Sequence, residues 1–193
     1  MEEEFGDSLE IEWRSFLLRP HPVEKRDLEK FVRYTESWLR PAAEPDAPRF
    51  QVWRSEEGPP SHSIPPHLVA KAAASLGPAS FREIHDRLLR AYFGENRDIT
   101  AEATLRAIWK EAGLPESEFA RSEDPELLEE TLDQHREAVQ RGVTGVPAER
   151  LVERDQPFTG GQGAEPTQEE RQHPLVGLDV QAALRLLQVV EGE

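Results

Sequence analysis

Residues 142–147 of this chain read Gly-Val-Thr-Gly-Val-Pro and lie at the boundary between two hydrophobic patterns. Before this stretch, apolar residues recur every three to four positions, which is the period of an amphipathic helix. After it, the pattern changes to the shorter period of strands, over residues 148–153 and 158–160. Gly142 suits the C′ position of a helix, where positive φ is needed. The sequence therefore predicts a helix, a tight loop and a strand hairpin, in that order.

The residues before this loop predict a block of helices within residues 61–141. Pro65 and Pro66 suit the first turn of a helix, where a missing N–H costs nothing. Thr100 is expected to cap one later helix and Asp124 another, because both side chains accept hydrogen bonds from free helical N–H groups. The predicted helices cover about residues 65–76, 81–93, 100–112 and 125–141.

The N-terminal third and the C-terminal end show further patterns. Residues 9–17 alternate between apolar and charged side chains, with Trp13 on the apolar face, and this period of two predicts a strand. Residues 23–39 have helical spacing, and residues 50–53 are compatible with a short strand. Beyond the hairpin, we expect a polar linker at 163–174 and an amphipathic helix over about 180–190.

Composition excludes several classes of function. The chain has 193 residues with 38 acidic and 23 basic side chains, for a formal net charge of -15. Binding to nucleic acid or to an anionic membrane depends on clustered Lys and Arg, so neither is expected. No apolar run approaches the ~20 residues that span a bilayer, and the first residues lack the features of a signal peptide. We therefore expect a cytoplasmic protein.

The chain contains no cysteine, so it offers neither a disulfide nor a thiol nucleophile.

Four stretches together resemble the DsbA-like branch of the thioredoxin fold. They are EIEWRSFLLRP at residues 10–20, SIPPHLVAKAA at 63–73, FREIHDRLLRAYFGENRDIT at 81–100 and GVTGVP at 142–147. The resemblance covers roughly residues 9–162 and is nearest to a cytoplasmic subgroup that includes 2-hydroxychromene-2-carboxylate isomerases. It implies an α/β, thioredoxin-like fold with an inserted all-helical subdomain. Residues 1–60 and 142–193 would form the thioredoxin-like sheet-and-helix part, and residues 61–141 the helical insertion.

The chain departs from this family at its start. A family member begins with a strand and a CxxC turn at the N-terminus of a long helix, whereas this chain opens where that helix would end. The resemblance therefore implies an N-terminally incomplete thioredoxin-like fold in which the catalytic turn is absent. We expect Met1 to be either a misplaced start or the start of a fragment.

The resemblance also implies a binding site at the GVTGVP loop. In the family, a cis-proline at this place faces the redox motif, and the preceding backbone holds a substrate in extended form. The corresponding residues here are Thr144, Gly145, Val146 and Pro147, with the Val146–Pro147 peptide expected to be cis. Without a thiol opposite, this loop is expected to bind substrate and to carry no chemistry, so no catalytic residue is assigned.

Other residue types that often carry chemistry are expected to be structural. His62, His67, His85 and His135 lack the spacing of a shared metal site, and buried histidines most often form structural hydrogen bonds. No metal site is predicted. Ser61 and Ser63, which precede Pro65-Pro66, are expected to be turn or cap residues. Trp53 and Trp109 are assigned either to the core or to the cleft between the helices and the sheet.

Two functions follow, and the sequence leaves both open. By resemblance the protein is a thiol-disulfide oxidoreductase of the DsbA family whose catalytic turn is absent from this chain, so this chain itself is expected to be inactive in dithiol chemistry. The alternative is a redox-inactive binding module, or a fragment of a glutathione-dependent isomerase. No cofactor is expected, apart from glutathione if the isomerase alternative holds. The expected partner is a peptide, a thiol or another small molecule in the groove beside Pro147.

Overall fold

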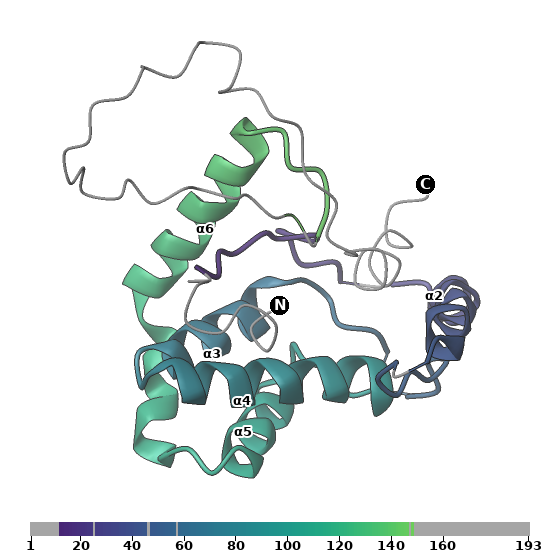
Figure 1. Ribbon diagram of the computed structural model, residues 1–193, viewed down its shortest axis with the longest axis horizontal. Helices are drawn as coiled ribbons and strands as arrows, with labels where there is room; N and C mark the ends of the chain where they lie inside the picture. The colour runs from purple at the N-terminus through teal and green to yellow at the C-terminus, as the bar shows by residue number, and fades with distance from the viewer. Residues whose placement is uncertain (1–11, 25, 46, 57, 147, 149–193) are drawn as a thin grey trace, which may run out of the picture.

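Helices of different lengths make up most of the described part of the chain (Figure 1). The computed structural model describes residues 12–24, 26–45, 47–56, 58–146 and 148. In Figure 1, α6 stands at one end of the molecule and α2 at the other, with α3, α4 and α5 between them. The segment from residue 12 to residue 24 runs across α3 from the α6 side towards α2.

The helices have the following bounds. The N-terminal group is α2 (Leu28–Thr35), followed by the short 3-10 helices η2 (Glu36–Leu39) and η3 (Pro41–Ala43). The central group is α3 (Ile64–Ala74), α4 (Pro78–Leu89), the π-helical turn η4 (Arg90–Gly94) and α5 (Glu102–Glu111). The last group is the 3-10 helix η5 (Glu116–Glu123) and α6 (Pro125–Gln140).

Local sequence explains where several of these helices begin. Asp124 caps α6, because its side chain accepts a hydrogen bond from the Glu126 N–H at 2.9 Å, as the sequence predicted. Asp27 caps α2 in the same way through the Lys30 N–H, also at 2.9 Å, so this helix starts later than the predicted residue 23. The prediction that Thr100 caps α5 is wrong. The N-cap is Ala101, and Thr100 instead donates both its N–H and its hydroxyl to the Asp98 carboxylate.

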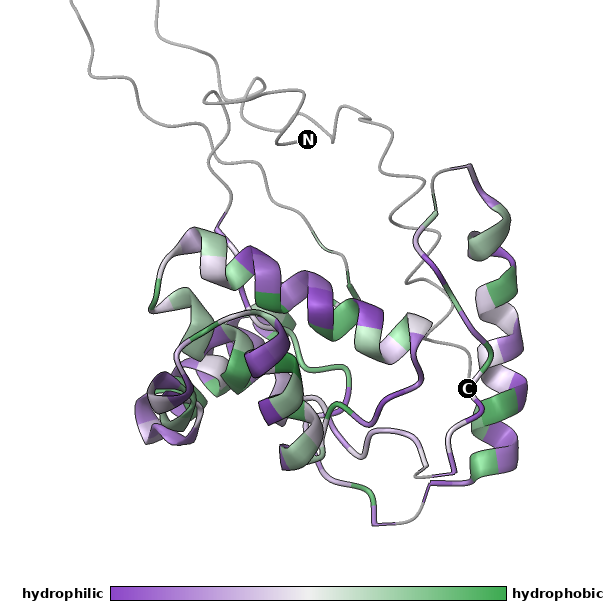
Figure 2. Cartoon of the chain, turned by 90° about the horizontal axis from the view of Figure 1, so that it is seen from below, coloured by the Kyte–Doolittle hydropathy of each residue, from purple (hydrophilic) through white to green (hydrophobic). Residues whose placement is uncertain are grey.

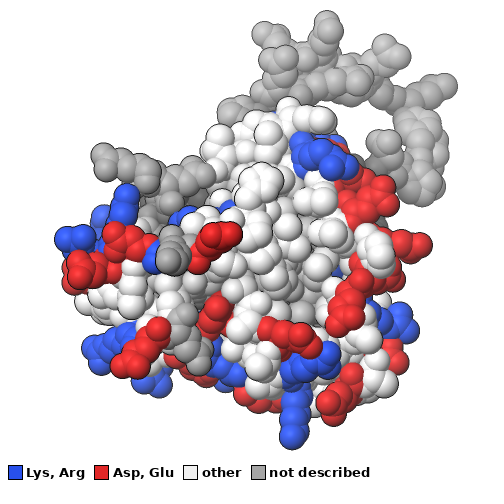
Figure 3. Space-filling view, turned by 180° about the vertical axis from the view of Figure 1, so that it is seen from behind, with Lys and Arg blue, Asp and Glu red and all other residues white. Residues whose placement is uncertain are grey.

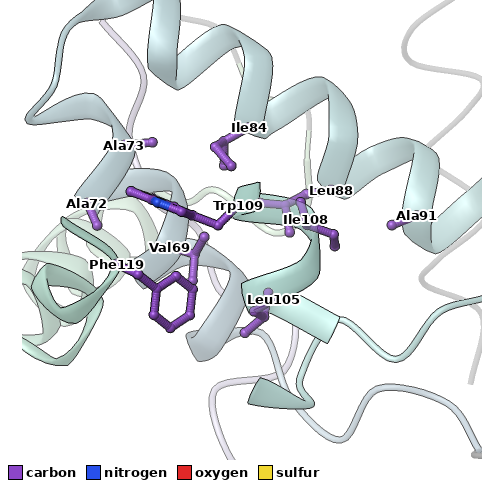
Figure 4. Packing of buried hydrophobic residues seen from close by; sticks show 10 residues of the cluster. All are labelled: Val69, Ala72, Ala73, Ile84, Leu88, Ala91, Leu105, Ile108, Trp109 and Phe119. Atoms are coloured by element: carbon purple, nitrogen blue, oxygen red, sulfur yellow. The ribbon is translucent and has the colours of Figure 1, made fainter. Parts of the chain in front are cut away.

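The main core joins α3, α4, α5 and η5, with Ala91 of η4 beside them (Figure 4). Its buried side chains are Val69, Ala72, Ala73, Ile84, Leu88, Ala91, Leu105, Ile108, Trp109 and Phe119. Trp109 lies fully inside this core and satisfies its indole N–H by donating to the Pro115 carbonyl at 2.9 Å. Figure 2 shows the corresponding amphipathic pattern, with hydrophobic and hydrophilic residues on different faces of the helices. Each fully buried large side chain contributes roughly 1.5–3 kcal/mol, so this core is the main source of stability in the helical part.

A second cluster consists of aromatic rings and lies where α2 and η2 meet η4. Its buried members are Phe31, Trp38 and Trp53, and partly buried rings pack against them. The Trp38 ring lies 4.9 Å from Phe93, and the Trp53 ring lies 5.3 Å from Phe31. Trp53 therefore belongs to this cluster and Trp109 to the main core, so both are core residues, which is one of the two alternatives that the sequence left open.

The strand predicted over residues 9–17 is wrong for the residues that the structure describes. Residues 12–17 form no ladder with another strand, and side chains of α6 instead take the backbone donors of Ser15 and Leu17. The Ser15 N–H donates to Gln134 Oε1 at 2.8 Å, and the Leu17 N–H donates to His135 Nδ1 at 3.2 Å. The alternation holds only in part: Ser15 and Leu17 are both buried, whereas Trp13, which was predicted to lie on the apolar face, is 53% exposed.

Residues 50–53 are likewise not a strand. The Gln51 N–H donates to the Phe93 carbonyl at 2.8 Å, and the Trp53 N–H donates to the Thr35 hydroxyl at 2.9 Å. Their partners are a helical turn and a side chain, so no ladder forms. Within the described part of the chain there is no strand at all. The strands predicted at 148–153 and 158–160, the linker at 163–174 and the helix at 180–190 lie outside the described residues, apart from Ala148, which is not in a strand.

Candidate functional site

The GVTGVP loop begins at a well-defined helix end. α6 closes with Gly142 at a φ of 82°, in the left-handed region that favours glycine. The Gly142 N–H donates to the Val139 carbonyl and the Val143 N–H donates to the Ala138 carbonyl, each at 3.0 Å. This pair of bonds is a Schellman motif, and it confirms Gly142 as the C′ residue. The direction in which the chain leaves α6 is therefore fixed by two hydrogen bonds.

Residues 144–146 have no backbone partner in the part of the chain that the structure describes. Thr144 is exposed, and Gly145 and Val146 are partly buried. Among the described residues, none forms a backbone–backbone hydrogen bond with residues 144–146. Unpaired backbone of this kind can accept a substrate segment through main-chain hydrogen bonds. Pro147 lies outside the described residues, so the cis geometry of the Val146–Pro147 peptide remains a prediction.

The segment from residue 12 to residue 19 is held against the same helix and against α3. Besides the two bonds to Gln134 and His135, Arg14 forms an ion pair with Glu137 near the end of α6. At the other end, the Arg19 N–H donates to Ser63 Oγ at 3.0 Å, and the Ser63 N–H donates to the Arg19 carbonyl at 2.8 Å. Ser63 is the N-cap residue of α3, as predicted, although its hydroxyl serves this segment and does not cap the helix. Hydrogen bonds with α6 therefore position both the segment 12–19 and the start of the GVTGVP loop.

Three histidines that the sequence treated separately lie near one another. His67 of α3 interacts electrostatically with His85 of α4 and His135 of α6. Burial, followed by the electrostatic effects of Lys71 and of the other two histidines, lowers the pKa of His67 to about 4. The His85 ring lies 5.1 Å from Trp13 and 5.6 Å from Phe81. Burial also lowers the pKa of His85, and Asp86 partly opposes this effect. His67 and His85 are thus suited to packing as neutral groups, and His135 accepts a hydrogen bond from the Leu17 N–H.

His62 lies elsewhere, next to Ser61. Ser61 Oγ and His62 Nδ1 are 2.8 Å apart, and the Ser61 N–H donates to the Thr100 hydroxyl at 3.4 Å. Burial lowers the pKa of His62, against the opposing effect of Asp98. A serine beside a histidine is the first part of a nucleophilic arrangement. Among the described residues, however, the Asp98 carboxylate accepts hydrogen bonds from Thr100 and none from the His62 imidazole, so we assign this pair a structural role in the loop before α3.

The described residues include no group of three or more His, Asp or Glu side chains placed to hold a metal ion. None of the described helices is long and apolar enough to cross a membrane. What sequence reasoning missed is the aromatic cluster with Arg26, whose guanidinium lies 4.4 Å from the centre of the Phe31 ring. The recurrence of aromatic residues at 31–38, 50–53 and 92–93 would have indicated the cluster, but not the arginine.

Comparison with known proteins assigns the family. The model of the DSBA-like thioredoxin domain matches residues 2–170. The chain therefore belongs to the DsbA-like thioredoxin family. No curated protein matches at the level required for significance.

A solved structure supports the same fold. The cytosolic disulfide reductase DsbM from Pseudomonas aeruginosa, determined with GSH, superposes with a TM-score of 0.52 at 22% sequence identity. The match covers 67% of this chain and 65% of that chain. At 22% sequence identity, this similarity shows a shared fold and nothing more. This chain spans about two thirds of its neighbour's length.

Proposed function

We propose that this chain is a thioredoxin-fold protein with a thiol-disulfide oxidoreductase-like role, in which it binds a thiol substrate along residues 144–147 and does not itself carry out dithiol exchange. The family match supports the first part of this proposal. The absence of cysteine from the sequence supports the second, because the thiolate is the nucleophile in such exchange.

The observation that carries the proposal is the unpaired backbone that follows the α6 cap. The two hydrogen bonds around Gly142 hold the start of the loop in place. Residues 144–146 then leave their N–H and C=O groups open among the described residues. A preformed, open backbone loses little conformational entropy when it pairs with an extended ligand, so it suits main-chain recognition of a peptide.

Glutathione is a suitable probe ligand for this site. The structural neighbour is named as a disulfide reductase and was determined with GSH. Glutathione is a small thiol peptide, and its main chain can pair with a protein backbone of this kind.

The domain organisation and the location belong to the same proposal. We propose that residues 61–141 are a helical insertion and that residues 1–60 and 142–193 form the thioredoxin-like part. The packing of α3, α4, α5 and η5 around one core supports the first assignment. We also propose a cytoplasmic location, which the cytosolic description of the structural neighbour supports weakly.

The experiment is an NMR titration of the ¹⁵N-labelled chain with reduced glutathione. We expect amide shifts at Thr144, Gly145 and Val146. Val146→Pro removes one N–H donor and is expected to weaken binding about two- to tenfold, which is the effect of one hydrogen bond. Val146→Ala keeps the donor and is the matched control, with affinity close to that of the unmodified chain.

A second assay tests the absence of dithiol chemistry. We expect the purified chain to leave insulin reduction at the background rate. Turnover above background would contradict this part of the proposal, and a titration in which residues 144–146 do not respond would contradict the binding part.

A further inference from the structure

We propose that residues 12–19 form a pH-sensitive latch on α6, which is closed while His135 is neutral and opens when His135 takes up a proton. In Figure 1 the latch lies between α6 and α3. Its opening needs no ligand, so the latch is independent of the binding proposed for residues 144–146.

Three backbone N–H groups of the latch, spaced two positions apart, donate to side-chain acceptors. The three bonds run from Ser15 to Gln134 Oε1 at 2.8 Å, from Leu17 to His135 Nδ1 at 3.2 Å and from Arg19 to Ser63 Oγ at 3.0 Å. Amide and hydroxyl oxygens accept hydrogen bonds throughout the physiological pH range, because these groups do not titrate there. An imidazole nitrogen accepts only while it carries no proton. The bond in the middle of the latch is therefore the one that acid breaks.

Protonation of His135 turns the acceptor at Nδ1 into a second donor. The Leu17 N–H and the imidazolium N–H would then face each other with no acceptor between them. Leu17 is only 2% exposed, so water is a poor replacement, and an unsatisfied buried donor is costly. The Phe16 ring also packs against the His135 ring, with the ring centres 5.1 Å apart. Two consecutive residues of the latch thus depend on this one imidazole.

The acidic groups of α6 near the latch are already paired with cations. The charged and titratable groups around the latch are Arg14 of the latch itself, His67 and Lys71 of α3, His85 of α4, and Glu130 and Glu137 of α6. Glu130 pairs with Lys71 at 2.6 Å, and Glu137 pairs with Arg14. Figure 3 shows on one face that Lys and Arg mostly lie beside Asp or Glu in the same way. A protonated His135 would therefore have to compete with a lysine or an arginine for either carboxylate.

Trp13 gives the latch its own signal. Its ring lies 5.8 Å from Phe81 and 5.1 Å from His85, and the residue is 53% exposed. The other three tryptophans are buried in the main core and in the aromatic cluster. Opening of the latch separates Trp13 from its two neighbours and leaves the buried tryptophans in place, so the four indole signals distinguish opening from unfolding.

The size of the effect follows from the coupling between proton binding and opening. The closed latch uses the lone pair of Nδ1, so only the open latch binds a proton there. An imidazole in water has a pKa near 6.5. Closure is therefore favoured above pH 6.5 and is weakened as the pH falls below it, and the equilibrium constant for opening should rise roughly twentyfold between pH 7 and pH 5.

The test is native-state hydrogen exchange of the ¹⁵N-labelled chain at pH 7 and pH 5, with each rate corrected for the intrinsic effect of pH. We expect the protection of the Leu17 amide to fall about tenfold or more, and the Trp13 indole signal to shift over the same range. The Ile108 amide lies in the main core and should stay better protected than the Leu17 amide at both pH values.

Two substitutions of His135 and one control separate the acceptor from the ring. His135→Gln supplies an acceptor that does not titrate, as Gln134 does for Ser15, and its Leu17 protection should change less than threefold between the two pH values. His135→Phe keeps a ring beside Phe16 but has no acceptor, and should lower the protection of Leu17 about fivefold or more already at pH 7. His21→Gln changes an exposed histidine outside the latch and should keep the full pH response.

Three results would overturn the inference. They are an unchanged protection of Leu17 in the unmodified chain, an equal fall in His135→Gln, and equal protection of Leu17 and Ile108 at pH 5, which would mean that the whole chain unfolds. If His135→Gln does not fold, His135→Phe decides at pH 7, because the inference requires it to lower the protection of Leu17 relative to that of Ile108. None of these measurements involves glutathione, so their failure would leave the proposed function of residues 144–146 as it stands.

Discussion

His67 shows how the position of one residue in the fold sets its chemistry. An imidazole in an unfolded chain has a pKa near 6.5, whereas burial, assisted by neighbouring positive charges, lowers the pKa of His67 to about 4. The folded chain therefore binds fewer protons at this position than the unfolded chain between these two values. Stability is fully present above pH 6.5 and is lost as the pH falls towards 4.

Replacing His67 should reduce this pH dependence. We expect the free energy of unfolding of the unmodified chain to fall by about 1–2 kcal/mol more between pH 7 and pH 5 than that of His67→Gln. The measurement is urea denaturation at the two pH values. His21→Gln changes an exposed histidine and is the control. An unchanged pH dependence in His67→Gln would show that this imidazole does not titrate as its burial implies. The lowered pKa values of His62 and His85 act in the same direction, so part of the dependence should remain.

At the scale of the element, the end of α6 decides where the binding loop begins. Gly142 has a φ of 82°, and among the described residues beyond its chain neighbours no atom lies within 4 Å of the position that a Cβ would occupy. A side chain at this position therefore meets no clash, and the cost of a substitution comes from the left-handed backbone alone. Among other residues, asparagine tolerates this conformation best.

We expect Gly142→Ala to lower the free energy of unfolding by about 1–2 kcal/mol and Gly142→Asn to lower it less. Chemical denaturation of both variants measures the difference. Because the Schellman bonds also position residues 144–146, Gly142→Ala should weaken glutathione binding more than Gly142→Asn does. Equal stability of the two variants would indicate that the loop leaves α6 in another way.

At the scale of the whole molecule, the core formed by α3, α4, α5 and η5 holds the surfaces that carry the proposed sites. Ile108 is fully buried in this core, whereas Leu89 on the neighbouring α4 is 45% exposed. We expect Ile108→Ala to lower the free energy of unfolding by about 2–5 kcal/mol, because it removes buried methyl groups and leaves a cavity. Leu89→Ala should cost less than about 1 kcal/mol. Thermal and urea unfolding of both variants, followed by circular dichroism, compares them, and similar losses would contradict this assignment of the core.

Local sequence was sufficient for the features that depend on neighbouring residues. Asp124 and Gly142 mark both ends of α6, the proline pair falls in the first turn of α3, and the four quoted stretches indicated the family that the family model supports. The place of the candidate loop followed from the same patterns, although the geometry at Pro147 remains a prediction. Caps, turns and helical periods can be predicted from the sequence because the groups that interact in them lie within a few residues of one another along the chain.

The tertiary structure alone decided what happens between distant segments. The alternation in residues 9–17 predicted a strand, but the backbone donors of Ser15 and Leu17 are taken by side chains of α6 more than a hundred positions away. The packing of Trp53 against Phe31 and Tyr92 in the aromatic cluster was equally invisible in the sequence. Alternation of apolar and polar residues indicates which side chains lie on the same face of an extended segment. It does not indicate which groups form hydrogen bonds with the backbone of that segment. That choice depends on which segments the hydrophobic core brings together, so only the folded chain reveals it.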